Sequence, residues 1–231
     1  MTRIWCALML VASAGAQQNA SPMKPTPDQL LSMRLAELDR VKVMGDLPGA
    51  IKGYEDVLDL VEADSALKNR GEEVLQRLAA SYLAAQRPAD GIRVSRRILE
   101  LHAEDCKPAA EWIERCADAQ YGLGLALMHA GEFAGATAEL TASADNFGKV
   151  KMDGDESFRM TKLKQRGDAE ALLAAALFRS GKKEQAVATF RKAVATLTVV
   201  TDNEKLDPAT RGSARRSRTD AEGSLKLLEG K

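Results

Sequence analysis

Hydrophobic and small residues recur along the chain in one pattern that appears four times. In the clearest copy, residues 169–197, apolar positions at helical spacing are followed by a polar break and then by a second apolar stripe. That copy contains Leu173, Ala174 and Leu177, the break at 180–183, and then Ala186, Phe190 and Ala193. The pattern predicts two antiparallel helices joined by a tight turn.

Three earlier segments repeat the pattern with different strength. The members of the third copy are Leu123, Gly124, Leu127, the break at Gly131, Ala136, Leu140 and Ser143. Those of the first are Leu38, Val41, the break at Gly45, Ala50, Tyr54 and Val57. Those of the second, weakest copy are Leu78, Ala79, Tyr82, a break at 86–88, Gly91, Ser95 and Ile98. The body of the chain is therefore predicted to be four helical hairpins.

Small and large residues alternate in a way that suits the packing of such hairpins. Small side chains such as Gly124 and Ala174 allow the two helices to approach closely, and a large residue such as Phe190 fills the space between successive pairs. Glycines at the breaks suit a left-handed cap at the end of the first helix. Each hairpin leaves an apolar face uncovered, so we expect neighbouring hairpins to stack.

This pattern of Leu-Gly/Ala, Tyr/Leu, Gly, Ala and Phe/Tyr/Leu resembles the tetratricopeptide repeat (TPR) family. The resemblance implies an all-α protein, an α-solenoid of about four TPR-like helix-turn-helix repeats, over residues 26–198. Residues 199–231 are then a loop and a C-terminal capping helix. The crossing residues 50, 91, 136 and 186 are 41, 45 and 50 apart, whereas family repeats have about 34 residues, so helices or connecting loops must be longer. The alternative is an ordinary helical bundle.

The two ends of this region have their own signals. Residues 1–16 combine Arg3, an apolar run and a small-residue cleavage site, which predicts a signal peptide and an exported protein, periplasmic or secreted. Residues 17–25 read as a flexible linker. Thr26 and Gln29 form a capping box around Pro27. No other segment is apolar enough to span a bilayer, so no stable membrane insertion is expected after cleavage.

Composition narrows the function further. The 33 basic residues balance the 33 acidic ones, which argues against a nucleic-acid binder. Two histidines and three cysteines leave little material for a metal site or a nucleophile, and no catalytic or phosphate-binding motif is present. We therefore expect a protein that is not an enzyme and has no metal or cofactor.

Cys106 and Cys116 are the cysteines left after cleavage, and export makes a disulfide between them plausible. If the chain were helical from Pro108 onward, the intervening residues would span about 13 Å, too far for a disulfide. A bond requires an irregular segment that folds back. Both states stay open at this point.

The resemblance also implies a binding surface, because the first helices of TPR hairpins line a concave groove. The expected partner-binding residues are Tyr121, Leu125, Met128, His129, Leu172, Phe178 and Arg179. These positions are apolar with a few charges, which suits an extended or helical protein segment, although core packing is the alternative role for each apolar one. The expected function is a protein-protein interaction module or scaffold with a protein or peptide partner. A structural subunit of an envelope complex, using its convex face or ends, is the alternative, and a homo-oligomer also remains open.

Overall fold

The computed structural model describes residues 25–107, 110–151 and 153–230. The predicted signal peptide and all but the last residue of the predicted linker lie outside the described residues. Within the described part the chain forms α-helices, one short 3-10 helix and no strand. The α-helices are α1 (Pro27–Val43), α2 (Leu47–Ala63), α3 (Gly71–Ala84), α4 (Pro88–Leu101), α5 (Ile113–Ala130), α6 (Phe133–Lys149), α7 (Glu156–Arg179), α8 (Lys183–Thr201) and α9 (Pro208–Glu229).

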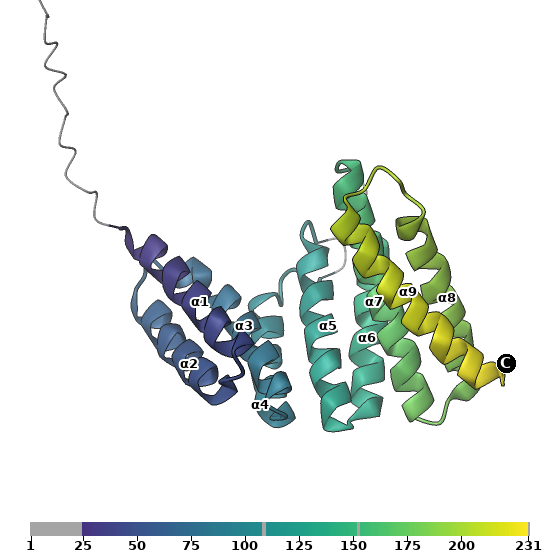
Figure 1. Ribbon diagram of the computed structural model, residues 1–231, viewed down its shortest axis with the longest axis horizontal. Coiled ribbons are helices and arrows are strands. Elements are labelled where there is room, and N and C mark those ends of the chain that lie inside the picture. Colours follow the sequence, from purple (N-terminus) through teal and green to yellow (C-terminus); the bar gives the residue numbers. More distant parts are fainter. Residues whose placement is uncertain (1–24, 108–109, 152, 231) are drawn as a thin grey trace, which may run out of the picture.

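Consecutive helices pack as four antiparallel hairpins, α1 with α2, α3 with α4, α5 with α6 and α7 with α8. The hairpins stand side by side in chain order, and α9 lies across the last one (Figure 1). Each hairpin contacts mainly its neighbours in the row, which is the arrangement of a repeat solenoid. The predicted all-α solenoid with a C-terminal capping helix is confirmed.

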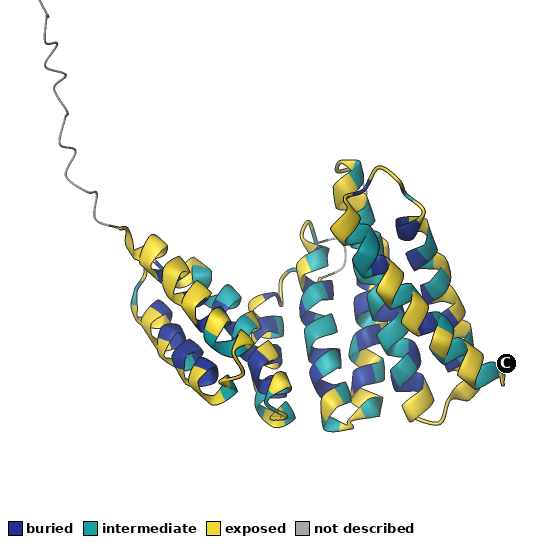
Figure 2. Cartoon of the chain, in the orientation of Figure 1, coloured by how far each residue is buried: buried dark blue, intermediate teal, exposed yellow. Residues whose placement is uncertain are grey.

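The core lies between the helices of each hairpin and between successive hairpins (Figure 2). The predicted crossing residues Ala50, Ala136 and Ala186 are fully buried, and the large residue that follows each of them is buried too. Gly124 on α5 allows the two helices of the third hairpin, α5 and α6, to cross closely. A Cβ atom there would lie 2.6 Å from Cγ of Leu140, so the leucine fills the space that the missing side chain leaves.

The turns inside the hairpins also follow the sequence. Gly45, Gly131 and Gly181 have positive φ angles of 92°, 76° and 79°, as predicted for left-handed caps. The second hairpin has no glycine at this point, and Gln86 takes the left-handed conformation with a φ of 56°. A residue with a Cβ is disfavoured in this conformation. This copy therefore lacks the turn glycine that marks the other three copies in the sequence.

Longer helices and longer connecting loops, the two expected sources, both contribute to the long spacing between crossing residues. The helix α7 has 24 residues, more than two full turns beyond its counterpart α3 with 14 residues. Irregular connections precede α3, α5 and α7, and the first of them contains the 3-10 helix Lys68–Arg70. The stack is therefore a divergent solenoid with unequal repeats.

Both predicted helix starts are present. The Thr26 hydroxyl accepts a hydrogen bond from the Gln29 backbone N–H at 3.2 Å, and the Gln29 side chain accepts one from the Thr26 N–H at 2.9 Å. Asp207 caps α9 by accepting from the Thr210 N–H at 2.9 Å. The helix α8 continues to Thr201, beyond residue 198, because Val200 and Thr201 are buried.

None of the helices in the described part of the chain is both long and apolar enough to cross a membrane.

Cys106 and Cys116 are joined by a disulfide, with their Cα atoms 5.1 Å apart. The helix α5 begins only at Ile113, and residues 110–112 lie outside it, so a helix does not hold the two cysteines apart over that stretch. Residues 102–106 form turns, with the Cys106 N–H donating to the His102 carbonyl at 3.1 Å. The bond therefore ties the end of the second hairpin to the first turn of the third.

Candidate functional site

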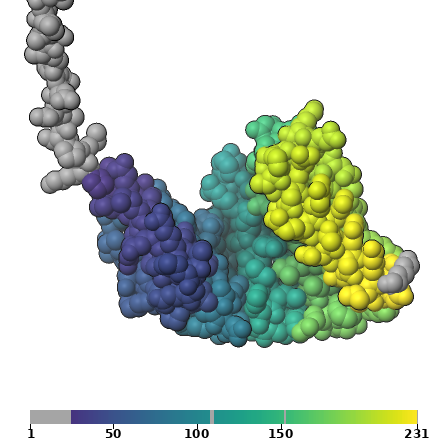
Figure 3. Space-filling model, viewed as in Figure 1, coloured from purple at the N-terminus to yellow at the C-terminus, as the bar shows by residue number. Residues whose placement is uncertain are grey.

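One face of the solenoid is hollowed between its N-terminal helices and α9, with residues of the middle hairpins at the bottom of the hollow (Figure 3). The inner helices α3, α5 and α7, together with α9, supply most of the side chains that line three cavities on this face. We call this face the groove. It is the surface that the TPR resemblance predicted as the binding site.

The first cavity, of about 200 Å³, lies between α3 and α5. The predicted residue Leu125 lines it, together with aliphatic side chains such as Leu83 and Ile98. Two carboxylates, Glu72 and Asp118, also line it. This part of the groove is therefore apolar with two acidic groups.

The second cavity, of about 310 Å³, lies between α5, α7 and α9. The predicted residues Tyr121 and Leu172 line it, and two further carboxylates, Asp168 and Asp220, are part of the same lining. Burial, and secondarily the nearby Asp168, raise the pKa of the Tyr121 hydroxyl, so it stays a neutral donor. The tyrosine also packs on the cores of the third and fourth hairpins, so it has a packing role, and its role in binding a partner stays a prediction.

The third cavity, of about 350 Å³, lies between α7 and α9 near the C-terminal end. Phe178 and Arg179, both predicted, line it beside Leu227 and Leu228. The Arg179 guanidinium lies 5.1 Å from the centre of the Phe133 ring, a cation–π contact that holds this arginine at the edge of the groove.

Two predicted residues lie apart from these cavities. Met128 is half-buried and packs against the core shared by α5 and α6. His129 is exposed in the last turn of α5. The remaining five are brought together on the groove, and whether they bind a partner stays a prediction.

The acidic groups in the groove were missed by the sequence analysis. Asp118 and Asp168 stand at the same place in successive repeats, each eighteen residues before the crossing alanine of its hairpin. That repetition was visible in the sequence, but a lone aspartate on a helix usually indicates a solvated face, so the pattern of apolar residues did not single them out.

The carboxyl of Asp118 has an unusual environment. Removal from bulk water in the groove raises its pKa to about 6, Lys162 opposes the rise, and Glu114 and Glu72 add to it. Gln165 donates a hydrogen bond to Asp118 Oδ1 at 2.9 Å. The side chain is still 43% exposed, so solvent screens part of this effect.

Replacing Asp118 with asparagine is expected to stabilise the protein at neutral pH. The pKa in the folded state lies above the ordinary value of 3.8, so stability is lost as the pH rises from about 4 through about 6. After allowance for solvent screening, the gain in the free energy of unfolding is about 1 kcal/mol at about pH 7.5 and vanishes near pH 3.5. Urea titrations of the Asp118→Asn variant at both pH values measure it.

Asp145 on α6 offers a matched control, because its side chain is exposed. The Asp145→Asn variant should match the wild type at both pH values. An equal gain for Asp118→Asn at both values would contradict the assigned environment.

Among residues 25–107, 110–151 and 153–230, no group of three or more histidine, cysteine or acidic side chains is placed to hold a metal ion. His102 is buried between two acids instead, with Nδ1 2.9 Å from Asp105 and Nε2 3.1 Å from Glu72. These contacts join α3 to the turn that carries Cys106, so the histidine has a structural role.

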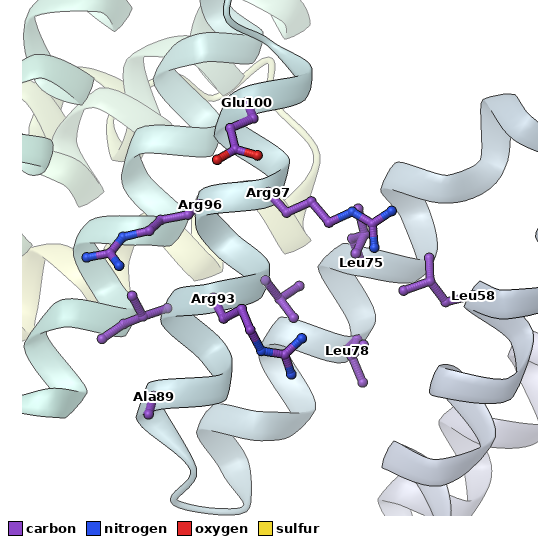
Figure 4. Close-up of a pocket in the computed structure, with 10 residues that line it drawn as sticks. Leu58, Leu75, Leu78, Ala89, Arg93, Arg96, Arg97 and Glu100 are labelled. Carbon is purple, nitrogen blue, oxygen red and sulfur yellow. The ribbon is translucent and has the colours of Figure 1, made fainter. Parts of the chain in front are cut away.

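A cavity of different character, about 600 Å³, lies between α2, α3 and α4 (Figure 4). Its apolar walls, including Leu58, Leu75 and Leu78, belong to the core. Arg96 and Arg97 point to opposite sides of α4, and Arg97 pairs with Glu62 of α2. The leucine side chains of this cavity are buried, whereas Leu83, Leu125 and Leu172 of the groove are half-buried.

No family model matches this sequence, and no curated protein matches it. The solved structures similar to this chain include two of a putative kinesin light chain from Podosopora anserina with nearly identical TPR-like repeats, one of them a point variant. The matches cover 87% of this chain and 90% of the other, at 16% identity, with TM-scores of 0.59 and 0.58. At this identity the likeness concerns the fold, and the chain has the fold of a TPR-like repeat solenoid.

Proposed function

We propose that this protein is a non-catalytic interaction module that binds a protein or peptide segment in its groove. The observation that carries the proposal is the groove itself: the inner helices of successive hairpins line cavities with side chains from elements far apart in sequence. Rigid helices hold these side chains in place, as recognition of a partner requires. We further propose that the protein acts after export, in the periplasm or outside the cell, as the pattern of residues 1–16 suggests.

Site-specific photo-crosslinking in the source cells tests where the partner binds. A photoreactive amino acid is placed at Leu125 or Phe178 in the groove, and at Leu60 or Val199 on the outer helices as matched controls. All four are apolar positions, and the two control side chains are about half exposed. Groove binding predicts one shared crosslinked product at Leu125 and Phe178 and none at the controls.

The second candidate is a structural subunit of an envelope complex that is held through its outer face. The exposed apolar side chains Leu60 on α2 and Val199 on α8 favour it. In that case the crosslinks would form at these two positions and be absent from the groove, which would contradict the proposal above.

A further inference from the structure

The groove carries one lining carboxylate on each of four helices, which are the first helices of the last three hairpins and the C-terminal helix α9. The carboxylates are Glu72 on α3, Asp118 on α5, Asp168 on α7 and Asp220 on α9. The linings of the first two cavities contain no lysine or arginine. The acidic groups therefore form a row across the hairpins, and we call them the carboxylate row.

Neighbouring cations offset this charge only in part. Lys162 Nζ lies 4.0 Å from Asp118 and Lys164 Nζ lies 2.6 Å from Asp168. His102 lies beside Glu72, while Glu114 adds another negative charge near Asp118. Lys68 lines another cavity together with Glu72, so three lysines face five carboxylates, and the bottom of the groove stays negative when the histidine is neutral.

Two acceptor atoms in this region have no hydrogen-bond partner among the described residues. They are Oδ1 of Asp168 and Oε1 of Gln165, and both atoms are buried. Buried acceptors without a donor cost free energy. A ligand cannot reach these buried oxygen atoms directly, but their partial charges add to the negative potential of this region, which favours an approaching cation over an acidic ligand.

Aliphatic and small side chains share the cavity linings with the carboxylates. Ala80, Leu83 and Leu125 accompany the first two, and Ala171, Leu172 and Ala175 accompany the second two. The surface thus offers apolar contact beside a row of negative charge. Its complement is an amphipathic segment that presents both lysine or arginine and apolar residues.

We infer that the groove binds a basic amphipathic segment of a partner protein, with its cations on the carboxylate row and its apolar side chains against the apolar linings of the same cavities. This inference rests on the proposed function and specifies the chemistry of the partner. The cavity between α2, α3 and α4 is lined instead by Arg93, Arg96 and Arg97 of α4 (Figure 4). Like charges there repel the same segment, so charge also selects the face that is used.

Three synthetic peptides of equal length and identical apolar positions test the inference, with lysine, glutamine or glutamate at the polar positions. Binding to the full chain is measured by fluorescence anisotropy at low salt. The lysine peptide should bind at least about tenfold more tightly than the glutamine peptide, and the glutamate peptide most weakly. Added salt should reduce the preference, because the groove is open to solvent.

The variant that combines Glu72→Gln, Asp118→Asn, Asp168→Asn and Asp220→Asn should lose about tenfold in affinity for the lysine peptide and none for the glutamine peptide. A matched control, Asp59→Asn with Asp145→Asn, neutralises exposed carboxylates on the outer helices α2 and α6. It should leave both affinities unchanged. Circular dichroism confirms that each variant is folded.

Equal binding of the three peptides, or an unchanged affinity in the fourfold variant, would overturn the inference. If that equal binding is lost on Leu172→Asp, the groove remains the binding face and only the charge preference is wrong. If no peptide binds and the groove positions give no crosslinks in cells, the proposed function fails as well.

Discussion

Leu140→Ala is expected to lower the free energy of unfolding by about 4 kcal/mol, the largest effect that we predict for a single substitution. Leu140 is completely buried and lies against Gly124 of the facing helix. The loss combines the transfer of the leucine side chain with the cavity left behind. Because Gly124 has no side chain to move into that space, the site can collapse little.

Urea unfolding followed by circular dichroism measures this change. Leu227→Ala removes the same atoms from a position that is 83% exposed, and it should cost less than about 0.5 kcal/mol. A loss below about 1.5 kcal/mol for Leu140→Ala would contradict the close crossing of α5 and α6.

Glu170→Ala is expected to cost about 3 kcal/mol. The carboxylate is 1% exposed and has three partners: Arg166 Nε donates to Oε1 at 3.0 Å, Lys192 Nζ lies 3.1 Å from the same oxygen, and the Thr196 hydroxyl donates to Oε2 at 2.7 Å. Its removal leaves two cations and a hydroxyl facing each other across α7 and α8. Both cations are partly exposed and can turn to water. The expected loss in the free energy of unfolding therefore lies at the lower end of the range for removing one partner of a buried ion pair.

Two further variants identify the source of that loss. Glu170→Gln keeps the side-chain volume and the bond from Thr196 but removes the charge, so it should cost about half as much. Glu204→Ala, at an exposed position in the loop before α9, should change the free energy of unfolding by less than about 0.5 kcal/mol. A neutral result for Glu170→Ala would show that the two cations find equally good partners elsewhere.

The hairpins could be predicted from the sequence because their signals are local. The stripes of small and large apolar residues, the glycine at the turn and the caps at Thr26 and Asp207 act within one or two helical turns. The fold then follows from the need to cover each open apolar face. Gln86 marks the limit of the glycine signal, since it takes the backbone conformation that glycine adopts elsewhere. The turn there is closed by the Arg87 N–H, which donates to the Tyr82 carbonyl at 2.8 Å.

Features that depend on distant partners could not be predicted in this way. Glu170 looks like a solvent-exposed residue in the sequence, and only the arrival of Lys192 and Thr196 from the next helix makes its burial tolerable. The carboxylate row likewise forms only when α3, α5, α7 and α9 are assembled. The positions of Leu125 and Phe178 on the groove could be predicted from the sequence, because they follow from the repeat geometry.

The bond between Cys106 and Cys116 has a consequence for the covalent integrity of the molecule. A protease that cut once between these two residues would leave the N-terminal and C-terminal halves attached through sulfur, and a reducing agent would be needed to release them. Proteolysis at that junction would therefore go unnoticed on a non-reducing gel and appear as two fragments after reduction.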